Sequence, residues 1–135
     1  MSLIKKILLI ILAIIALVLV VQFVNAGKYR MIVNVVAGDN VVGINPLADN
    51  LDFGDLSRNN GMTRYVSMKN NGKMEIRVMA IKFGEISDLV RLDKNNFILK
   101  PGEEVKLAFE IKIPPSAQTK KYTGWAIVFR IPKVF

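Results

Sequence analysis

Residues 103–113 read EEVKLAFEIKI, with apolar and polar side chains alternating along the whole stretch. One face is apolar throughout and the other is mostly charged: Val105, Leu107, Phe109, Ile111 and Ile113 on the first, and Glu104, Lys106, Ala108, Glu110 and Lys112 on the second. A period of two residues indicates a β-strand with one buried and one solvated face. Pro101-Gly102 precedes the stretch and Pro114-Pro115 follows it, and both pairs are strand-ending signals.

Shorter stretches of the same kind cover the chain from Gly27 onward. The other expected strands are 29–36, 41–44, 51–53, 63–69, 74–83, 89–92, 96–99 and 122–131. Within 74–83 the apolar face changes phase after Ala80, which predicts a bulge or a crossing between sheets. Short strands at intervals of about 8–12 residues, without an amphipathic helix, are typical of an antiparallel β-sandwich. We therefore expect an all-β fold with seven to nine strands.

A long apolar segment precedes this domain. Residues 7–24 read ILLIILAIIALVLVVQFV, in which Gln22 is the only polar residue. At about 1.5 Å per residue such a helix spans about 27 Å, close to the ~30 Å hydrocarbon core of a bilayer. This length favours a retained transmembrane α-helix in residues 1–26, with the β domain in 27–135. The alternative is cleavage after Ala26, because Val24-Asn25-Ala26 suits a signal peptidase.

The charges beside the apolar segment predict its orientation. Lys5 and Lys6 precede it, so the N-terminus is expected inside and the domain outside the cytoplasm, in a single-pass protein of the cell membrane; cleavage would make the domain a secreted one. At the outer interface we expect Phe23, Lys28, Tyr29 and Arg30 beside lipid headgroups. Membrane lipid around residues 7–24 is therefore one expected partner.

The composition excludes several kinds of chemistry. The chain has no cysteine and no histidine, which removes disulfides, thiol nucleophiles, imidazole bases and the usual transition-metal ligands. Glu85 and Asp88 are the remaining candidate acid–base pair, and no other catalytic motif accompanies them. We expect no enzymatic activity and no cofactor. Calcium is the one metal considered, at Asp49, Asn50, Asp52 and Asp55, but their spacing fits turn formation better.

The formal net charge of +8 suggests an anionic partner outside the cell, such as an envelope polymer or lipid headgroups. Nucleic acid is not expected, because no binding motif accompanies the charge. Lys120 and Lys121 form a small basic patch that is a candidate contact surface. The methionines of the middle strands, Met62, Met68, Met74 and Met79 among them, are expected mainly in the core, and an adaptable binding surface is the alternative.

Three stretches have a familiar order: LDFGDLSRNNGMTRYVSMKNNG at 51–72, LKPGEEVKLAFEIKIPPSA at 99–117 and KYTGWAIVFRI at 121–131. Together they resemble bacterial and archaeal immunoglobulin-like surface modules of the galactosidase-associated type and, more remotely, major-sperm-protein-like domains. Lys121 departs from the glycine that these modules often carry before the tyrosine. The resemblance implies an immunoglobulin-like antiparallel β-sandwich that serves as a spacer, adhesive unit or assembly part.

The last strand holds further candidates. Tyr122 is expected to hydrogen-bond a backbone group across a corner of the sandwich. Trp125 lies on the opposite face from Tyr122, and core packing is favoured for it over an exposed contact site. Phe135 ends the chain in FRIPKVF, where the terminal segment packs on its own core or adds to a neighbour's sheet.

These observations predict a non-enzymatic, membrane-anchored surface protein whose domain makes protein–protein or cell-envelope contacts. One alternative is a structural subunit of a filament or surface layer, built by a pilin-like packing of helices or by strand exchange, and with self-association. Lys6 meets Ile7 directly, so the cleavage signal of pilin-like subunits is absent. The other alternative is an accessory component of an export or motility machine.

Overall fold

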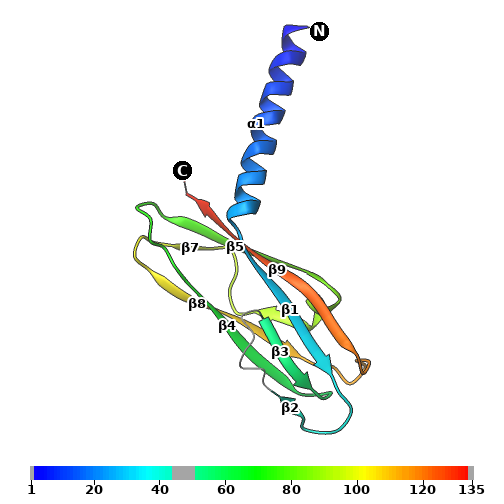
Figure 1. Cartoon of the computed structure of the whole chain (residues 1–135). Helices are drawn as coiled ribbons and strands as arrows, with labels where there is room; N and C mark the ends of the chain where they lie inside the picture. The colour runs from blue at the N-terminus through cyan, green and yellow to red at the C-terminus, as the bar shows by residue number, and fades with distance from the viewer. Residues whose placement is uncertain (1, 44–50, 134–135) are drawn as a thin grey trace.

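A computed structural model describes residues 2–43 and 51–133 of the chain. The elements, in chain order, are α1 (Leu3–Asn25), β1 (Gly27–Val35), β2 (Val42–Gly43), β3 (Leu51–Leu56), β4 (Gly61–Lys69), β5 (Ile76–Gly84), the 3-10 helix η1 (Glu85–Leu89), β6 (Val90–Leu92), β7 (Phe97–Leu99), β8 (Glu104–Lys112) and β9 (Lys121–Pro132). One helix therefore precedes a domain built of strands, which confirms the predicted all-β class with its N-terminal helix (Figure 1).

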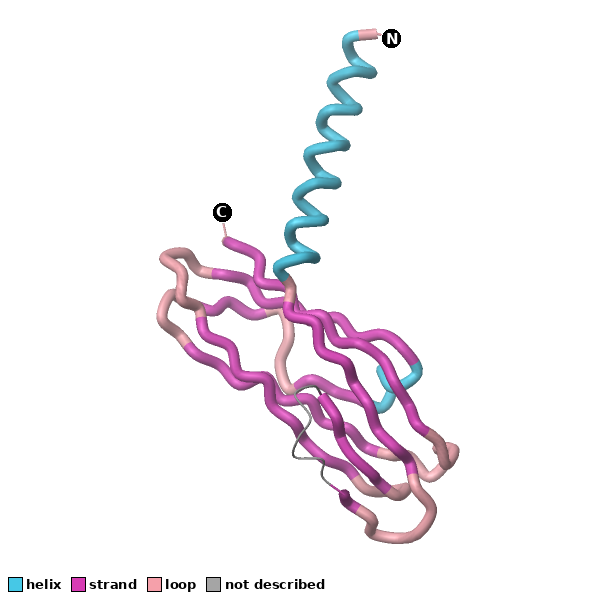
Figure 2. The backbone as a smooth tube through the Cα atoms, viewed as in Figure 1, coloured by secondary structure: helices cyan, strands magenta, loops and turns pink. Residues whose placement is uncertain are grey.

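The strands form two sheets that pack face to face (Figure 2). The larger sheet has the order β2-β3-β1-β9-β5-β7, and the smaller one has the order β4-β8-β6. Side chains from both sheets bury one continuous core, in which Phe53 of β3, Val128 of β9 and Phe109 of β8 are fully covered. Burial of this apolar area is the main stabilising contribution in a chain without disulfides.

The 103–113 stretch forms the centre of the smaller sheet. β8 pairs with β4 from Gly61↔Lys112 to Lys69↔Glu104, and with β6 from Val90↔Ile111 to Leu92↔Phe109. Its inward side chains Leu107, Phe109 and Ile111 are fully buried, and its charged side chains are exposed. The predicted strand and the predicted orientation of its faces are confirmed.

One strand pair departs from the antiparallel expectation. β1 and β3 run parallel, with Met31 opposite Leu51 and Val35 opposite Leu56. A parallel pair needs a connection of about a dozen residues or more, since the chain must return to the same end of the sheet. Residues 36–50 supply that length. The local alternation of side chains carries no information on this pairing, so the sequence did not reveal it.

The predicted bulge or sheet crossing in 74–83 is wrong. β5 pairs with β9 in unbroken register from Ile76↔Pro132 to Gly84↔Gly124. Val78 and Ala80 face the core, whereas Met79, Ile81 and Phe83 point to the outside of the larger sheet. The apparent change of phase therefore reflects a strand that is apolar on both faces.

A buried polar side chain joins the two sheets at one end of the sandwich. The side-chain amide of Asn70 donates to the carbonyl oxygens of Met74 (2.8 Å) and Leu99 (3.0 Å), and its oxygen accepts from Gly72 N (3.0 Å). Buried polar groups are stable where they are fully hydrogen-bonded in this way. Asn70 thus links the turn after β4 to strand β7 of the other sheet.

We expect Phe109→Ala to lower the free energy of unfolding by about 3 to 5 kcal/mol, because it removes a fully buried aromatic ring and leaves a cavity. Tyr65→Ala, on the exposed face of the same sheet, should cost less than about 1 kcal/mol. Urea titration of the full chain in detergent, followed by circular dichroism, measures both. Equal losses for the two variants would contradict the assigned core.

Candidate functional site at the helix–sheet junction

A single residue, Ala26, separates the helix from the sheet. Its N–H donates to the carbonyl oxygen of Phe23 (3.3 Å), and the next residue, Gly27, already pairs with Val128 of β9. Ala26 itself is buried. The end of α1 is therefore held against the centre of the larger sheet, and the last turns of the helix contact β9.

Lys28 caps the C-terminal end of α1. Its Nζ donates to the carbonyl oxygens of Val24 (3.4 Å) and Ala26 (3.3 Å) and lies 4.8 Å from the centroid of the Phe23 ring. A cation at a helix C-terminus satisfies unpaired carbonyls and interacts favourably with the helix dipole. The aromatic ring adds a cation–π contact.

The residues predicted at the membrane interface fall into three places. Phe23, Lys28 and Arg30 lie together at the junction with exposed side chains. Lys5 and Lys6 lie at the other end of α1, where the Ser2 hydroxyl caps the helix by accepting from Lys5 N (3.3 Å). Tyr29 differs from the expectation, because it lies on the inward face of β1 and packs against the core.

Beside the junction, β5 and β9 present a row of apolar side chains to the outside of the sheet. We call this set the apolar ladder: Met79, Ile81 and Phe83 of β5, and Trp125, Ile127, Phe129 and Ile131 of β9. Cross-strand partners stand directly opposite one another, as in Phe83↔Trp125, Ile81↔Ile127 and Met79↔Phe129. Ile81, Phe83 and Trp125 keep 48%, 47% and 42% of their surface exposed, whereas Ile127 is buried.

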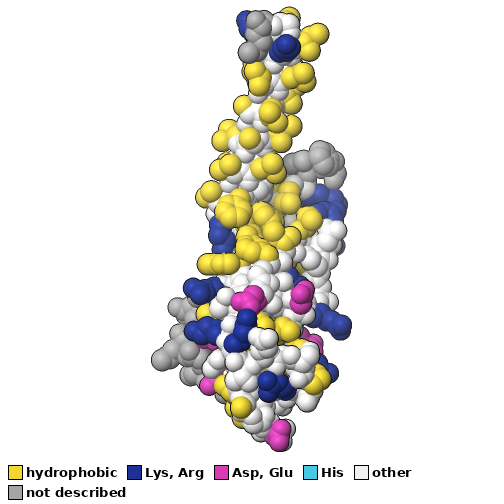
Figure 3. Space-filling view, turned by 90° about the vertical axis from the view of Figure 1, so that its right-hand side faces the viewer, with side chains coloured by type: hydrophobic (Ala, Val, Ile, Leu, Met, Phe, Trp, Pro, Cys, Tyr) yellow, Lys and Arg dark blue, Asp and Glu magenta, His cyan; other side chains and the backbone are white. Residues whose placement is uncertain are grey.

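The apolar ladder is continuous with the helix. A groove of about 560 Å³ runs between them, lined by Leu19, Val20, Gln22 and Phe23 of α1 and by Met79, Ile81, Phe129 and Ile131 of the ladder. Figure 3 shows the hydrophobic surface passing from the helix onto the adjoining part of the domain, with basic side chains beside it. Helix and sheet therefore share one apolar surface.

Trp125 belongs to this surface and is exposed, so the favoured prediction of core packing was wrong, and a contact role for Trp125 stays a prediction. Ile81, Phe83 and Phe129 were not singled out from the sequence as members of a surface, and for Met79 a surface position was only the alternative to the core. The usable signal was apolar character on both faces of 76–83 and 125–131, since a half-buried strand needs only one apolar face. Met74 is also exposed, whereas Met68 is buried as expected.

The basic patch of the sequence is partly neutralised. The Lys120 ammonium binds the carboxylate of Glu85 and lies 5.0 Å from the centroid of the Tyr122 ring. Lys121 is exposed at the start of β9.

The end of β9 carries the other predictions made for the last strand. Phe135 lies outside the described residues, and so does Val134, whereas Ile131 and Pro132 before them pair with β5 of the same chain. The Tyr122 hydroxyl accepts from the backbone N–H of Gln118 (3.0 Å), which confirms the predicted corner bond.

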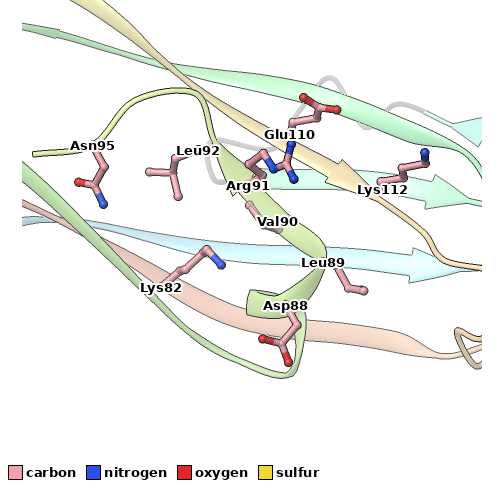
Figure 4. A pocket seen from close by; sticks show the side chains of 9 residues that line it. All are labelled: Lys82, Asp88, Leu89, Val90, Arg91, Leu92, Asn95, Glu110 and Lys112. Carbon is pink, nitrogen blue, oxygen red and sulfur yellow. The ribbon is translucent and has the colours of Figure 1, made fainter.

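A polar pocket of about 670 Å³ opens between the sheets near η1 (Figure 4). Lys82, Asp88, Arg91, Glu110 and Lys112 supply its charged lining. Asp88 is thus in a pocket, but its predicted acid–base partner Glu85 is bound to Lys120 and does not line that pocket. The two carboxyl groups therefore do not line one pocket together.

The candidate calcium loop is described only in part. Asp49 and Asn50 lie outside the described residues. Asp52 and Asp55 lie within strand β3, so the expected turn is wrong at these two positions. Asp52 accepts from Gly54 N (2.8 Å), where Gly54 has a positive φ and the pairing of β3 with β1 shifts register, and Asp55 accepts from the side-chain amide of Asn34 (3.1 Å). Within 2–43 and 51–133, no group of three or more His, Cys, Asp or Glu side chains is arranged to hold a metal ion.

The fold and the junction define a two-sheet β domain behind one apolar helix. No protein family, no curated protein and no solved structure matches this chain.

We expect the pKa of the Lys120 ammonium to lie above its ordinary value of 10.5, chiefly because of its hydrogen bond to Glu85 and against an opposing effect of burial. The favourable interaction is present below 10.5 and is lost as the pH rises through the higher value. An NMR titration of the lysine Nζ measures the midpoint. Glu85→Gln should move it back toward 10.5, and Asp88→Asn should leave it raised. An unchanged midpoint in Glu85→Gln would contradict the ion pair.

Proposed function

We propose that this chain is a non-enzymatic, membrane-anchored surface protein whose immunoglobulin-like domain makes protein–protein or cell-envelope contacts at the outer face of the membrane. One observation carries the proposal. α1 is a 23-residue helix whose most apolar 18-residue stretch has a mean hydropathy of 3.4; the domain buries none of its side chains, and it joins the sheet through one residue. A helix this apolar and this exposed is unfavourable in water and suited to a bilayer.

The arrangement of charges supports the orientation. Lys5 and Lys6 lie at one end of α1 and the β domain at the other, so the positive-inside tendency directs the domain outward. Lys28 and Arg30 are then headgroup-level cations at the outer end. The +8 net charge gives the exported domain an attraction for anionic lipid or polymer.

The smaller sheet is the surface best suited to a partner. Its outer face carries charged and polar side chains, with Tyr65 of β4 63% exposed among them. Among the strands of 2–43 and 51–133, nine-residue β4 stands at the edge of that sheet and pairs with β8 alone. An edge strand offers unpaired backbone groups to which an extended segment of another protein adds.

The anchor is tested by topology and by mass. The chain has no native cysteine, so Ser67→Cys on β4 and Ser2→Cys before α1 each place one label site. A membrane-impermeant maleimide should label Ser67→Cys on intact cells and leave Ser2→Cys unlabelled until the cells are opened. The intact mass of membrane-fraction protein should include residues 1–26. A mature mass beginning at Gly27 would contradict the anchor.

The contact function is tested by photo-crosslinking in cells. A photoreactive residue at Tyr65 should give discrete adducts with a protein or envelope polymer, because this position faces away from the core in the smaller sheet. The same residue at Ser57, which is fully buried, is the matched control and should give none. A hydrolase or transferase activity that disappears in Glu85→Gln or Asp88→Asn would overturn the non-enzymatic assignment.

A further inference from the structure

The groove and the apolar ladder lie at the level of the last turns of α1. Leu19, Val20 and Phe23 line the groove from the helix side. At about 1.5 Å per residue, Leu19 lies about 9 Å before the helix end at Asn25. In a helix that crosses a bilayer, this position is within the hydrocarbon of the outer leaflet. The sheet residues that share the groove are therefore at the same depth.

The residues of the ladder suit that location. Phe129 and Ile131 flank the groove, whereas Trp125 and Phe83 lie farther along the strands from the helix. Tryptophan is enriched at the boundary between hydrocarbon and headgroups, and aliphatic and phenyl groups are favoured deeper. Exposure of this many large apolar side chains to water is unfavourable, and such patches mark membrane or partner surfaces.

The outer face of β1, β5 and β9 carries basic side chains and no acidic ones: Lys28, Arg30, Arg77 and Lys121. Glu75 and Glu85, just beyond the two ends of β5, are paired with Lys133 and Lys120. Arg30 stands opposite Trp125, and Lys28 stands opposite Ile127 and beside Phe23 at the rim of the groove. Cations that flank an apolar surface at headgroup depth attract anionic phospholipids.

We propose that the apolar ladder rests in the outer leaflet of the bilayer, with phospholipid acyl chains in the groove beside α1 and anionic headgroups at Lys28 and Arg30. The larger sheet then lies against the membrane, and the smaller sheet faces away from it. This inference rests on the proposed function in one respect, since α1 must span the bilayer.

A lipid occupant fits the continuity of the surface better than a protein one does. The groove is formed in part by helix side chains that are themselves at lipid depth. Lipid is present there without any further component. A second copy of the chain or the helix of a partner would also cover the ladder, and the experiment below distinguishes these occupants.

Trp125 is the only tryptophan of the chain and is a member of the ladder, so the native protein carries its own reporter. The full chain is reconstituted at low density in vesicles of phosphatidylcholine and phosphatidylglycerol. Phospholipids brominated on the upper half of the acyl chain quench a tryptophan that reaches their depth. We expect loss of Trp125 emission with these lipids, and less loss when the bromine is near the chain's methyl end.

Two matched variants place the reporter elsewhere. In Trp125→Phe with Phe129→Trp the reporter lies beside the groove, and quenching by the deeper bromine should rise. In Trp125→Phe with Tyr65→Trp the reporter lies on the smaller sheet, and quenching should be lost. Circular dichroism checks that both variants keep the fold.

The role of the anionic headgroups is tested separately. Replacement of phosphatidylglycerol by phosphatidylcholine should reduce the quenching of Trp125. The substitution Arg30→Gln should reduce it as well.

The outcomes separate this inference from the anchor. If the chain resists carbonate extraction from the vesicles while Trp125 is not quenched, the anchor stands and the lipid-bound ladder is overturned. The lipid-bound ladder is likewise overturned if the Tyr65→Trp reporter is quenched as strongly as Trp125. Quenching that is absent at low density, together with crosslinked dimers through Phe83→Cys, would assign the ladder to a second copy. Failure of the chain to remain in the vesicles would overturn both proposals.

Discussion

The pairing of β1 with β9 is the constraint on which the rest of the structure depends. It begins at Gly27↔Val128, directly after the helix, and continues to Asn34↔Lys121. β9 pairs on its other side with β5, so the helix is attached to the middle of the larger sheet. A hinge would need unpaired backbone between helix and sheet, and Ala26 alone does not provide it. The direction of α1 and the direction of the strands are thereby coupled.

The two sheets use their outer faces differently. The smaller sheet follows the usual pattern of an antiparallel sheet, with one buried face and one charged face. The larger sheet is apolar on both faces where β5 and β9 meet, and only the inner face contributes to the core. Its outer residues lie outside that core, and several of them stay exposed. An apolar outer face is expected of a sheet that contacts something other than water on that side.

The sequence was informative where one strand could be read by itself. The alternation in 103–113 predicted β8 and both its faces, and the hydrophobic length of 7–24 predicted α1. The sequence did not predict features that depend on which strand lies next to which. The parallel pairing of β1 with β3 leaves no trace in either strand, because side-chain periodicity is the same in both directions.

For a related reason, the sequence predicted only the part of the candidate site that lies next to the helix end. Phe23, Lys28 and Arg30 could be placed because they follow a recognisable apolar segment. Ile81 and Trp125 lie far apart in sequence from that segment, and only the register of β5 on β9 brings them beside it. An apolar residue on a strand is assigned by default to the core. Two apolar faces on one strand are the sign that this default does not hold.

The short connection at Ala26 also limits the volume that the domain can sample. A domain on a long flexible linker samples a volume above the membrane, and its effective concentration toward distant targets depends on that linker. Here no such volume exists, because the sheet begins one residue after the helix. In a membrane the domain would diffuse in two dimensions with its height fixed. It would contact only those molecules that come within one domain length of the lipid. The rate of these contacts would depend on crowding in the plane of the membrane and not on the length of a linker.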